Sequence, residues 1–175
     1  SKMKDVLYDI RYLLLTHIHS DHIKPATLQK IKTLFPKITI LGNYEVAQKF
    51  DVDIIVNNGF PVVTKDYTFL PVKGTHDVVV TGYSFWINNQ HVCYMTDTNS
   101  YSDFKEAPYD YFFIELNYDE KKLKEIGSNF SKRGYNPVLS AQRHASVQLG
   151  KGFYYSNRRD TDSKLIPLHM SERFF

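Results

Sequence analysis

Metal-ligand side chains crowd into one short stretch of the sequence. Residues 17 to 22 read His-Ile-His-Ser-Asp-His and follow directly on a short apolar run. In an extended stretch, side chains two positions apart point the same way, so His17 and His19 can close on one ion. Asp21 and His22 come where a turn leading into a helix could aim them at a second ion. This density favours a metal centre over a surface loop that is rich in histidine by chance.

Further candidate ligands lie at the ends of later apolar segments. His76, His144 and His169 each lie beside turn-forming or small polar residues, and Asp97 follows another apolar run. Strand ends are where α/β folds place functional groups, because loops converge there while the sheet stays rigid. His91 lies inside a strand pattern instead, and we interpret it as structural.

Together these motifs resemble the metallo-β-lactamase superfamily of metal-dependent hydrolases. The matching pieces span nearly the whole chain, in residues 16–22, 74–76, 95–98 and 168–174. The resemblance implies an α/β (α+β) fold, the αββα sandwich, and a hydroxide nucleophile between two divalent metal ions. Carried over residue by residue, it implies that one ion is held by His17, His19 and His76, the second by Asp21, His22 and His169, and that Asp97 bridges them.

Zinc is the favoured metal. A donor set of imidazoles and carboxylates without a thiolate accepts zinc or manganese, and the order of affinities favours zinc where both are available. Two cations could lower the pKa of a shared water and neutralise charge on an attacked phosphate and its leaving oxygen. Asp21 adds a carboxylate that can accept a proton, so it is a catalytic candidate as well as a ligand.

The C-terminal third is similar to ribonuclease Z, to YycJ-type exonucleases and to phosphodiesterases of the same superfamily. Residues 112–119 resemble their strand-end carboxylate motif, and residues 143–146 resemble their extra histidine motif. The resemblance implies that Glu115 and His144 form a catalytic pair, because a carboxylate fixes the tautomer of its histidine and raises its basicity. The alternative is a helix-capping turn at the end of this motif with an incidental histidine. The residues expected to contact substrate are Arg143, Ser146 and Arg173.

Positive charge is concentrated in the same third of the chain. Residues 1–120 hold 11 Lys and Arg against 15 Asp and Glu, a net charge of −4, whereas residues 121–175 hold 11 against 4, a net charge of +7. A basic region beside the predicted site fits an anionic phosphate substrate, a nucleic acid or a nucleotide. For any single Lys or Arg, an ordinary solvated surface is the alternative.

Composition fits a single domain in a reducing compartment. At 175 residues the chain suits one packed domain, which we assign to residues 1–175. The single cysteine, Cys93, excludes a disulfide framework, and no apolar stretch reaches the length of a membrane span. We therefore expect a cytoplasmic protein that does not contact a membrane.

The N-terminal part of the domain is short. Only 16 residues precede His17, whereas metallo-β-lactamase folds normally reach this motif after several strands. We expect this sequence to be truncated at its N-terminus. Missing strands would leave sheet edges that favour pairing, so a homodimer is one expected assembly.

The sequence predicts alternating strands and helices without a linker. A turn at Asn88-Asn89 is expected to join two strands as a hairpin. The predicted helices are 25–34, opened by a proline, then 45–50, 120–126 and 145–149. The predicted strands are 12–15, 38–41, 53–56, 67–72, 78–87, 91–95, 111–114 and 165–168.

Three functions remain open from the sequence. The first is a dinuclear metal-dependent phosphodiesterase or nuclease that hydrolyses phosphodiester bonds of nucleic acid. The second is a phosphodiesterase acting on cyclic nucleotides or other small molecules. The third is a metal-stabilised binding module without turnover, against which the complete set of seven predicted ligands argues. A β-lactamase function ranks lower, because Asp21 and the Glu115–His144 pair fit phosphoester chemistry better.

Overall fold

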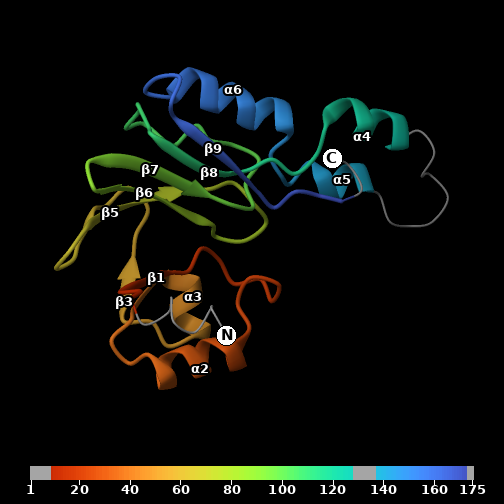
Figure 1. Ribbon diagram of the computed structural model, residues 1–175. Coiled ribbons are helices and arrows are strands. Elements are labelled where there is room, and N and C mark those ends of the chain that lie inside the picture. The colour runs from red at the N-terminus through yellow and green to blue at the C-terminus, as the bar shows by residue number, and fades with distance from the viewer. Residues whose placement is uncertain (1–8, 128–136, 173–175) are drawn as a thin grey trace. The chain divides into compact units, whose positions relative to one another are not determined.

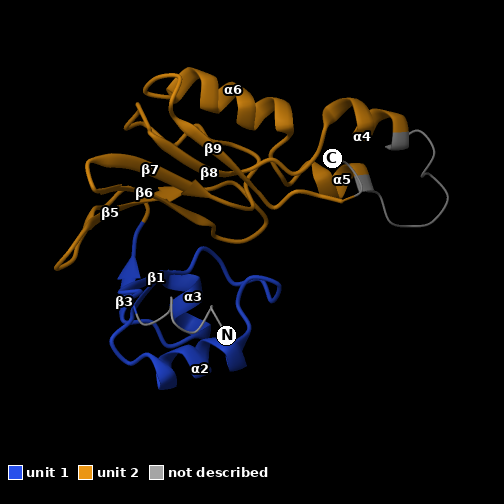
Figure 2. Cartoon of the chain, viewed as in Figure 1, with its two compact units in different colours: residues 1–57 blue, residues 58–175 orange. Residues whose placement is uncertain are grey.

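The chain divides into two compact units, residues 1–57 and residues 58–175 (Figure 2). The structure is a computed structural model that describes residues 9–127 and 137–172. Each unit has a sheet of its own. The single domain over residues 1–175 stays a prediction.

The first unit is a parallel three-stranded sheet with two helical crossovers (Figure 1). Parallel strands need such crossovers, since a tight turn would reverse the chain direction. The strand order is β1-β2-β3. The elements in chain order are β1 (Tyr12–Leu14), α2 (Pro25–Leu34), β2 (Thr39–Asn43), α3 (Tyr44–Lys49) and β3 (Ile54–Val56).

Helices α2 and α3 share one apolar core with the sheet. Leu28 of α2, Val46 of α3 and Ile40 of β2 belong to the same buried cluster. Pro25 opens α2, where its missing N–H costs nothing, and the Asn43 side chain accepts a hydrogen bond from the Val46 N–H at the start of α3. These signals place the two helices close to where the sequence predicts them.

The second unit contains a six-stranded sheet in the order β4-β5-β6-β7-β8-β9. Its first four strands are antiparallel neighbours, whereas β8 and β9 run parallel to β7. The predicted hairpin joins β6 to β7, with φ of 49° at Asn88 and 63° at Asn89, the left-handed region that such a turn requires. The strands are β4 (Val62–Val63), β5 (Thr68–Lys73), β6 (Thr81–Ile87), β7 (Gln90–Met95), β8 (Tyr111–Glu115) and β9 (Lys164–Leu168).

Helix α6 (Val147–Asn157) covers one face of this sheet (Figure 1). Its Tyr154 belongs to the core cluster that also holds Met95 and Phe112 of the strands, and Phe153 packs against that cluster. Two shorter helices, α4 (Glu120–Gly127) and α5 (Pro137–Ala141), contact each other beside the sheet. No helix among the described residues is long and apolar enough to cross a membrane.

Two element predictions were wrong in extent. The strand predicted over 78–87 begins only at Thr81, because residues 78–80 form a loop whose Val80 is nevertheless fully buried. The helix predicted over 145–149 starts later and runs to Asn157. Strand β4 and helix α5 were not predicted at all. Burial in the core explains both the apolar loop residue and the long helix, since tertiary packing overrides local propensity.

His91 lies in a buried polar network, in keeping with a structural role. Its Nδ1 lies 3.0 Å from the Pro108 carbonyl oxygen and its Nε2 lies 2.8 Å from the Ser84 hydroxyl. Burial lowers the pKa of His91 below its ordinary value of 6.5, against the raising effect of the Pro108 carbonyl, Glu106 and Asp110; Arg159 adds to the lowering.

This lowered pKa predicts a loss of stability in acid. The unfolded chain binds the proton of His91 more readily than the folded chain, so this contribution is complete above the ordinary pKa of 6.5 and is lost as pH falls below it. We expect the metal-free protein to unfold at lower urea concentration at about pH 5.5 than at about pH 7.5, and His91→Gln to show a smaller difference. An equal pH dependence in both proteins would contradict this.

Candidate metal centre

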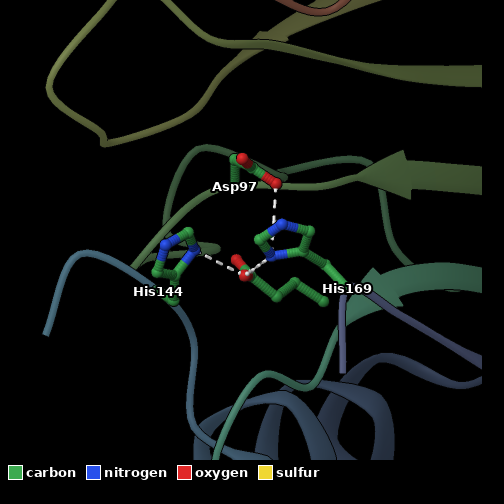
Figure 3. Close-up of side chains that lie close together, drawn as sticks. Asp97, His144 and His169 are labelled. Atoms are coloured by element: carbon green, nitrogen blue, oxygen red, sulfur yellow. Dashed lines mark hydrogen bonds and ion pairs between the residues drawn. The ribbon is translucent and has the colours of Figure 1, made fainter. Parts of the chain in front are cut away.

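Three of the predicted residues lie together at one edge of the second sheet. Because β7, β8 and β9 run parallel, their carboxyl ends meet there. Asp97 follows β7, Glu115 ends β8 and His169 follows β9. With His144, these side chains offer four ligand atoms within 4.8 Å of one another. Figure 3 shows Asp97, His144 and His169 around a shared carboxylate.

The shared carboxylate is that of Glu115, which is fully buried. Its Oε1 lies 2.7 Å from His144 Nδ1 and 2.8 Å from His169 Nδ1. Its Oε2 accepts hydrogen bonds from the Thr98 N–H at 2.8 Å and the Ala145 N–H at 3.4 Å. The expected contact between Glu115 and His144 is therefore present, and Glu115 also orients His169, which the sequence did not predict.

The environment of Glu115 favours its charged form. Burial alone would raise the pKa of this carboxyl, but hydrogen bonds from His144, His169 and the Thr98 N–H outweigh burial and hold the pKa below its usual value. A carboxylate on Nδ1 selects the tautomer in which Nε2 is the coordinating or proton-carrying nitrogen. In both His144 and His169, Nε2 is therefore the nitrogen that can bind a metal or carry a proton.

Both residues that follow a strand end at this edge have an unusual backbone conformation. Asp97 has a φ of 52° and His169 a φ of 51°. Left-handed φ values are uncommon for residues other than glycine, although Asp and His tolerate them better than most, and such conformations cluster at functional sites. The sharp turn at each position places the side chain next to Glu115, and His169 Nδ1 lies 3.5 Å from Asp97 Oδ1.

Several residues that hold Asp97, Glu115 and His169 in place were not predicted. Their residue types are common throughout proteins and do not by themselves indicate a metal site. Thr96 donates a 2.7 Å hydrogen bond to Asp97 Oδ1, and Asn117 donates one of 2.8 Å to the His169 carbonyl oxygen. The Tyr101 hydroxyl donates a 2.6 Å hydrogen bond to the Glu115 carbonyl oxygen. Their only sequence signal is their position within a few residues of a predicted ligand.

His76 is held in place by polar contacts with Arg143 and Asp77, which also contact each other. His76 Nδ1 lies 3.1 Å from the Arg143 carbonyl oxygen, and its Nε2 lies 3.1 Å from Asp77 Oδ1. The guanidinium of Arg143 donates to the other oxygen of Asp77 at 3.0 Å. Burial lowers the pKa of His76, against the raising effects of the Arg143 carbonyl and Asp77. The imidazoles of His76 and His144 are 5.0 Å apart between ring centres.

Arg143 and Ser146, both expected to contact substrate, already have partners in the protein. The guanidinium of Arg143 is 60% exposed, so it retains donors beyond the one that binds Asp77. Ser146 is buried and caps α6 by accepting the Leu149 N–H at 3.0 Å, and its hydroxyl donates to Glu120 at 2.7 Å. The third expected contact, Arg173, lies outside the described residues.

The capping geometry of Ser146 predicts the effect of its removal. Ser146→Ala deletes the acceptor at the start of α6, and loss of such a cap typically costs about 1 kcal/mol. We expect the free energy of unfolding, measured by urea denaturation, to fall by this amount, with Ser146→Thr retaining most of it. A substrate-binding role would instead appear as a raised KM at unchanged stability.

The histidine segment of the first unit forms a compact cluster by itself. His17 is fully buried, and its ring centre lies 4.8 Å from that of His19 and 4.3 Å from that of His22. A turn closed by the His22 N–H on the His19 carbonyl oxygen brings Asp21 Oδ2 to 3.7 Å from His22 Nε2. The fourth ligand side chain, Asp21, is exposed.

Hydrogen bonds of neighbouring residues hold the chain in place where this segment begins. The Thr16 hydroxyl lies 2.9 Å from His17 Nδ1, and the Thr16 carbonyl oxygen accepts a 3.1 Å hydrogen bond from the Asn43 side chain. Asn43 also caps α3, so its amide joins the start of that helix to Thr16, the residue before the first predicted ligand. The donor set in both units, imidazole and carboxylate without thiolate, suits a borderline or hard divalent ion such as zinc or manganese.

Comparison with solved structures settles the fold. The chain aligns over 98% of its length, with a TM-score of 0.66 and 16% identity, with the metallo-β-lactamase fold protein YhfI from Bacillus subtilis, covering 70% of that chain. It also aligns with a diphosphatase of the PhnP family at a TM-score of 0.67, 15% identity and 98% coverage, and with the short form of human tRNase Z at 0.64, 14% and 95%. The chain has the metallo-β-lactamase fold.

The metallo-β-lactamase fold was predicted from the sequence, and this prediction is confirmed. The chain spans 65% of the PhnP-family diphosphatase and 74% of the human tRNase Z. No protein-family model matches the sequence, and no curated protein matches it either. At 14–16% identity these structures establish the metallo-β-lactamase fold alone, so the chemistry must be argued from the site.

Proposed function

We propose that this protein is a dinuclear metal-dependent phosphodiesterase or nuclease that hydrolyses phosphodiester bonds of nucleic acid. The proposal rests on one observation above others, the buried Glu115 carboxylate that binds Nδ1 of both His144 and His169. One histidine of such a pair can coordinate a metal while the other handles a proton. The fold is similar to the folds of a diphosphatase and a tRNase, and this similarity supports phosphoester chemistry.

The proposed ligands are the seven predicted residues. One ion would be held by His17, His19 and His76 and the other by Asp21, His22 and His169, with Asp97 shared. Divalent ions, when bound, lower the pKa of water and neutralise charge on a phosphate. Zinc is the proposed metal and manganese the alternative.

The remaining residues have proposed roles in binding and proton transfer. Glu115 binds Nδ1 of His144, so that this imidazole presents Nε2 and can give a proton from that nitrogen to the leaving oxygen. Asp21 is exposed and can accept a proton from an incoming water. The guanidinium of Arg143 keeps donors that can bind a phosphate oxygen beside the one that binds Asp77.

Metal-dependent cleavage tests the proposal. The protein, loaded with zinc or manganese, is incubated with single-stranded and duplex DNA and RNA, before and after chelation. Cleavage that requires metal, and that His17→Ala and Asp97→Asn abolish, is expected. Asp103→Asn is a matched control, because it removes one exposed carboxylate from the loop that follows Asp97. Cleavage unaffected by chelation and by both ligand variants would refute the proposal.

Two other functions predict different results in the same assay. A phosphodiesterase of small molecules would hydrolyse cyclic mononucleotides or bis(p-nitrophenyl) phosphate and leave strands intact. A metal-stabilised binding module would bind metal, detected by elemental analysis, and turn over none of these substrates. Cytoplasmic location and a homodimer stay predictions, tested by fractionation of the host cell and by light scattering.

A further inference from the structure

A groove of about 400 Å³ lies in the second unit between α6 and the loop that follows β7. Helix α6 contributes a stripe at helical spacing that includes Leu149, Gly152, Phe153 and Ser156. The loop contributes residues 100–102 and Phe104. The predicted metal ligands and the Glu115–His144 pair do not line this groove.

The lining of the groove is neutral. Among the described residues, no Lys, Arg, Asp or Glu lines it, so the groove offers no charged side chain to a phosphate. Phe153 supplies the accessible aromatic surface, and its ring stacks on the buried Tyr101 with centres 4.8 Å apart and planes inclined by 20°. Serine hydroxyls at 100, 102 and 156 supply polar groups. An aromatic floor with neutral hydroxyls suits a flat, uncharged, polar ring.

Gly152 leaves open space beside the helix backbone at the groove. A Cβ at this position would meet nothing within 4 Å, so the packing of the protein does not require glycine there. Glycine inside a helix costs roughly 0.5–1 kcal/mol relative to alanine. Gly150, two residues earlier, is different, because a Cβ there would clash with Leu116. A flat ring could therefore lie against the helix backbone at Gly152, in the space that a larger side chain would fill.

The groove is connected to the predicted centre through a short piece of chain. Ser100 comes three residues after Asp97, which limits the distance between their Cα atoms to about 11 Å. Between them, the Thr98 N–H binds the Glu115 carboxylate, and Tyr101 in the groove floor binds the Glu115 carbonyl oxygen. A ring a few bonds from a phosphate at Asp97 is therefore within reach.

We propose that this groove binds the nucleoside part of the phosphodiester substrate, with the base against Phe153 and Gly152. The inference rests on the proposed function for its catalytic consequence, but binding of the nucleoside does not. The groove then sets specificity, because it distinguishes a nucleoside ester from a simple alkyl ester.

Two substrates with the same leaving group test this specificity. Thymidine 5′-(p-nitrophenyl phosphate) carries a nucleoside, and methyl p-nitrophenyl phosphate does not. We expect kcat/KM to favour the nucleoside ester by about tenfold or more, a typical contribution of one well-filled pocket. Gly152→Leu fills the groove and should reduce the ratio of the two values to about one. Lys151→Leu, which places the same side chain on a neighbouring exposed position outside the groove, should keep the ratio.

A binding measurement separates this inference from the proposed function. Thymidine and adenosine are titrated into the ¹⁵N-labelled protein, and shifts are expected at the amides of Gly152 and Ser100 in the parent protein and in Lys151→Leu, but not in Gly152→Leu. If neither ester is hydrolysed while these shifts occur, the proposed function fails and the groove stands. An unchanged ester ratio in Gly152→Leu, or the absence of shifts with both nucleosides, would overturn the inference.

Discussion

Glu115→Gln is expected to lower the metal affinity of the protein by about 10- to 100-fold, with a comparable or larger loss of phosphodiester cleavage. The carboxylate accepts two imidazole N–H groups on one oxygen and two backbone N–H groups on the other. An amide has only one accepting atom. Whichever way the glutamine side chain turns, its NH₂ group faces donors, so at least one pair of contacts is lost.

Metal affinity is measured by competition with a chromophoric zinc chelator, and cleavage is measured with bis(p-nitrophenyl) phosphate. Asp103→Asn, an exposed carboxylate-to-amide change, should leave both unchanged. Thermal unfolding of each metal-free variant identifies any loss of fold. A Glu115→Gln protein that binds zinc as tightly as the parent would show that Glu115 does not orient a ligand.

Gly150→Ala is expected to destabilise the protein by about 1–3 kcal/mol, the usual cost of overpacking a core. The added Cβ would lie far inside van der Waals contact with Leu116 Cδ2 and 3.0 Å from the Glu115 carbonyl oxygen. Leu116 is 2% exposed and has little room to move. The strain would therefore fall on the chain at Glu115 itself.

Gly152→Ala is the matched control on the same helix. Its Cβ would meet nothing within 4 Å, so the gain in helix propensity should raise stability by about 0.5–1 kcal/mol. Urea denaturation of both variants measures the opposite signs. A stable Gly150→Ala protein would mean that α6 can move away from β8, and that the packing which fixes Glu115 is looser than the structure indicates.

Much of the cluster in the second unit could be predicted from the sequence, because strand ends are visible as apolar runs that stop at a polar residue. Asp97, Glu115 and His169 follow that rule. The role of Glu115 as a partner of two histidines could not be predicted. It depends on the lateral order β7-β8-β9, which no single segment encodes.

Local signals explain which helices could be predicted. Pro25 begins α2 and Asn43 caps α3, so both helices carry their own start. Helix α6 contains two glycines and several aromatic residues, which lower helix propensity, and its length is fixed by packing on the sheet. Strand β4 has two residues and gave no periodic signal.

The backbone at Asp97 and His169 also limits how this centre could be changed. Both residues hold a left-handed φ, a conformation that β-branched and most long side chains adopt only at a cost. The choice of donor atom is therefore coupled to the shape of the main chain. Directed evolution toward another metal could therefore use only Asp, Asn, His and Gly at these two positions. Positions with ordinary backbone angles could accept a wider range of residues.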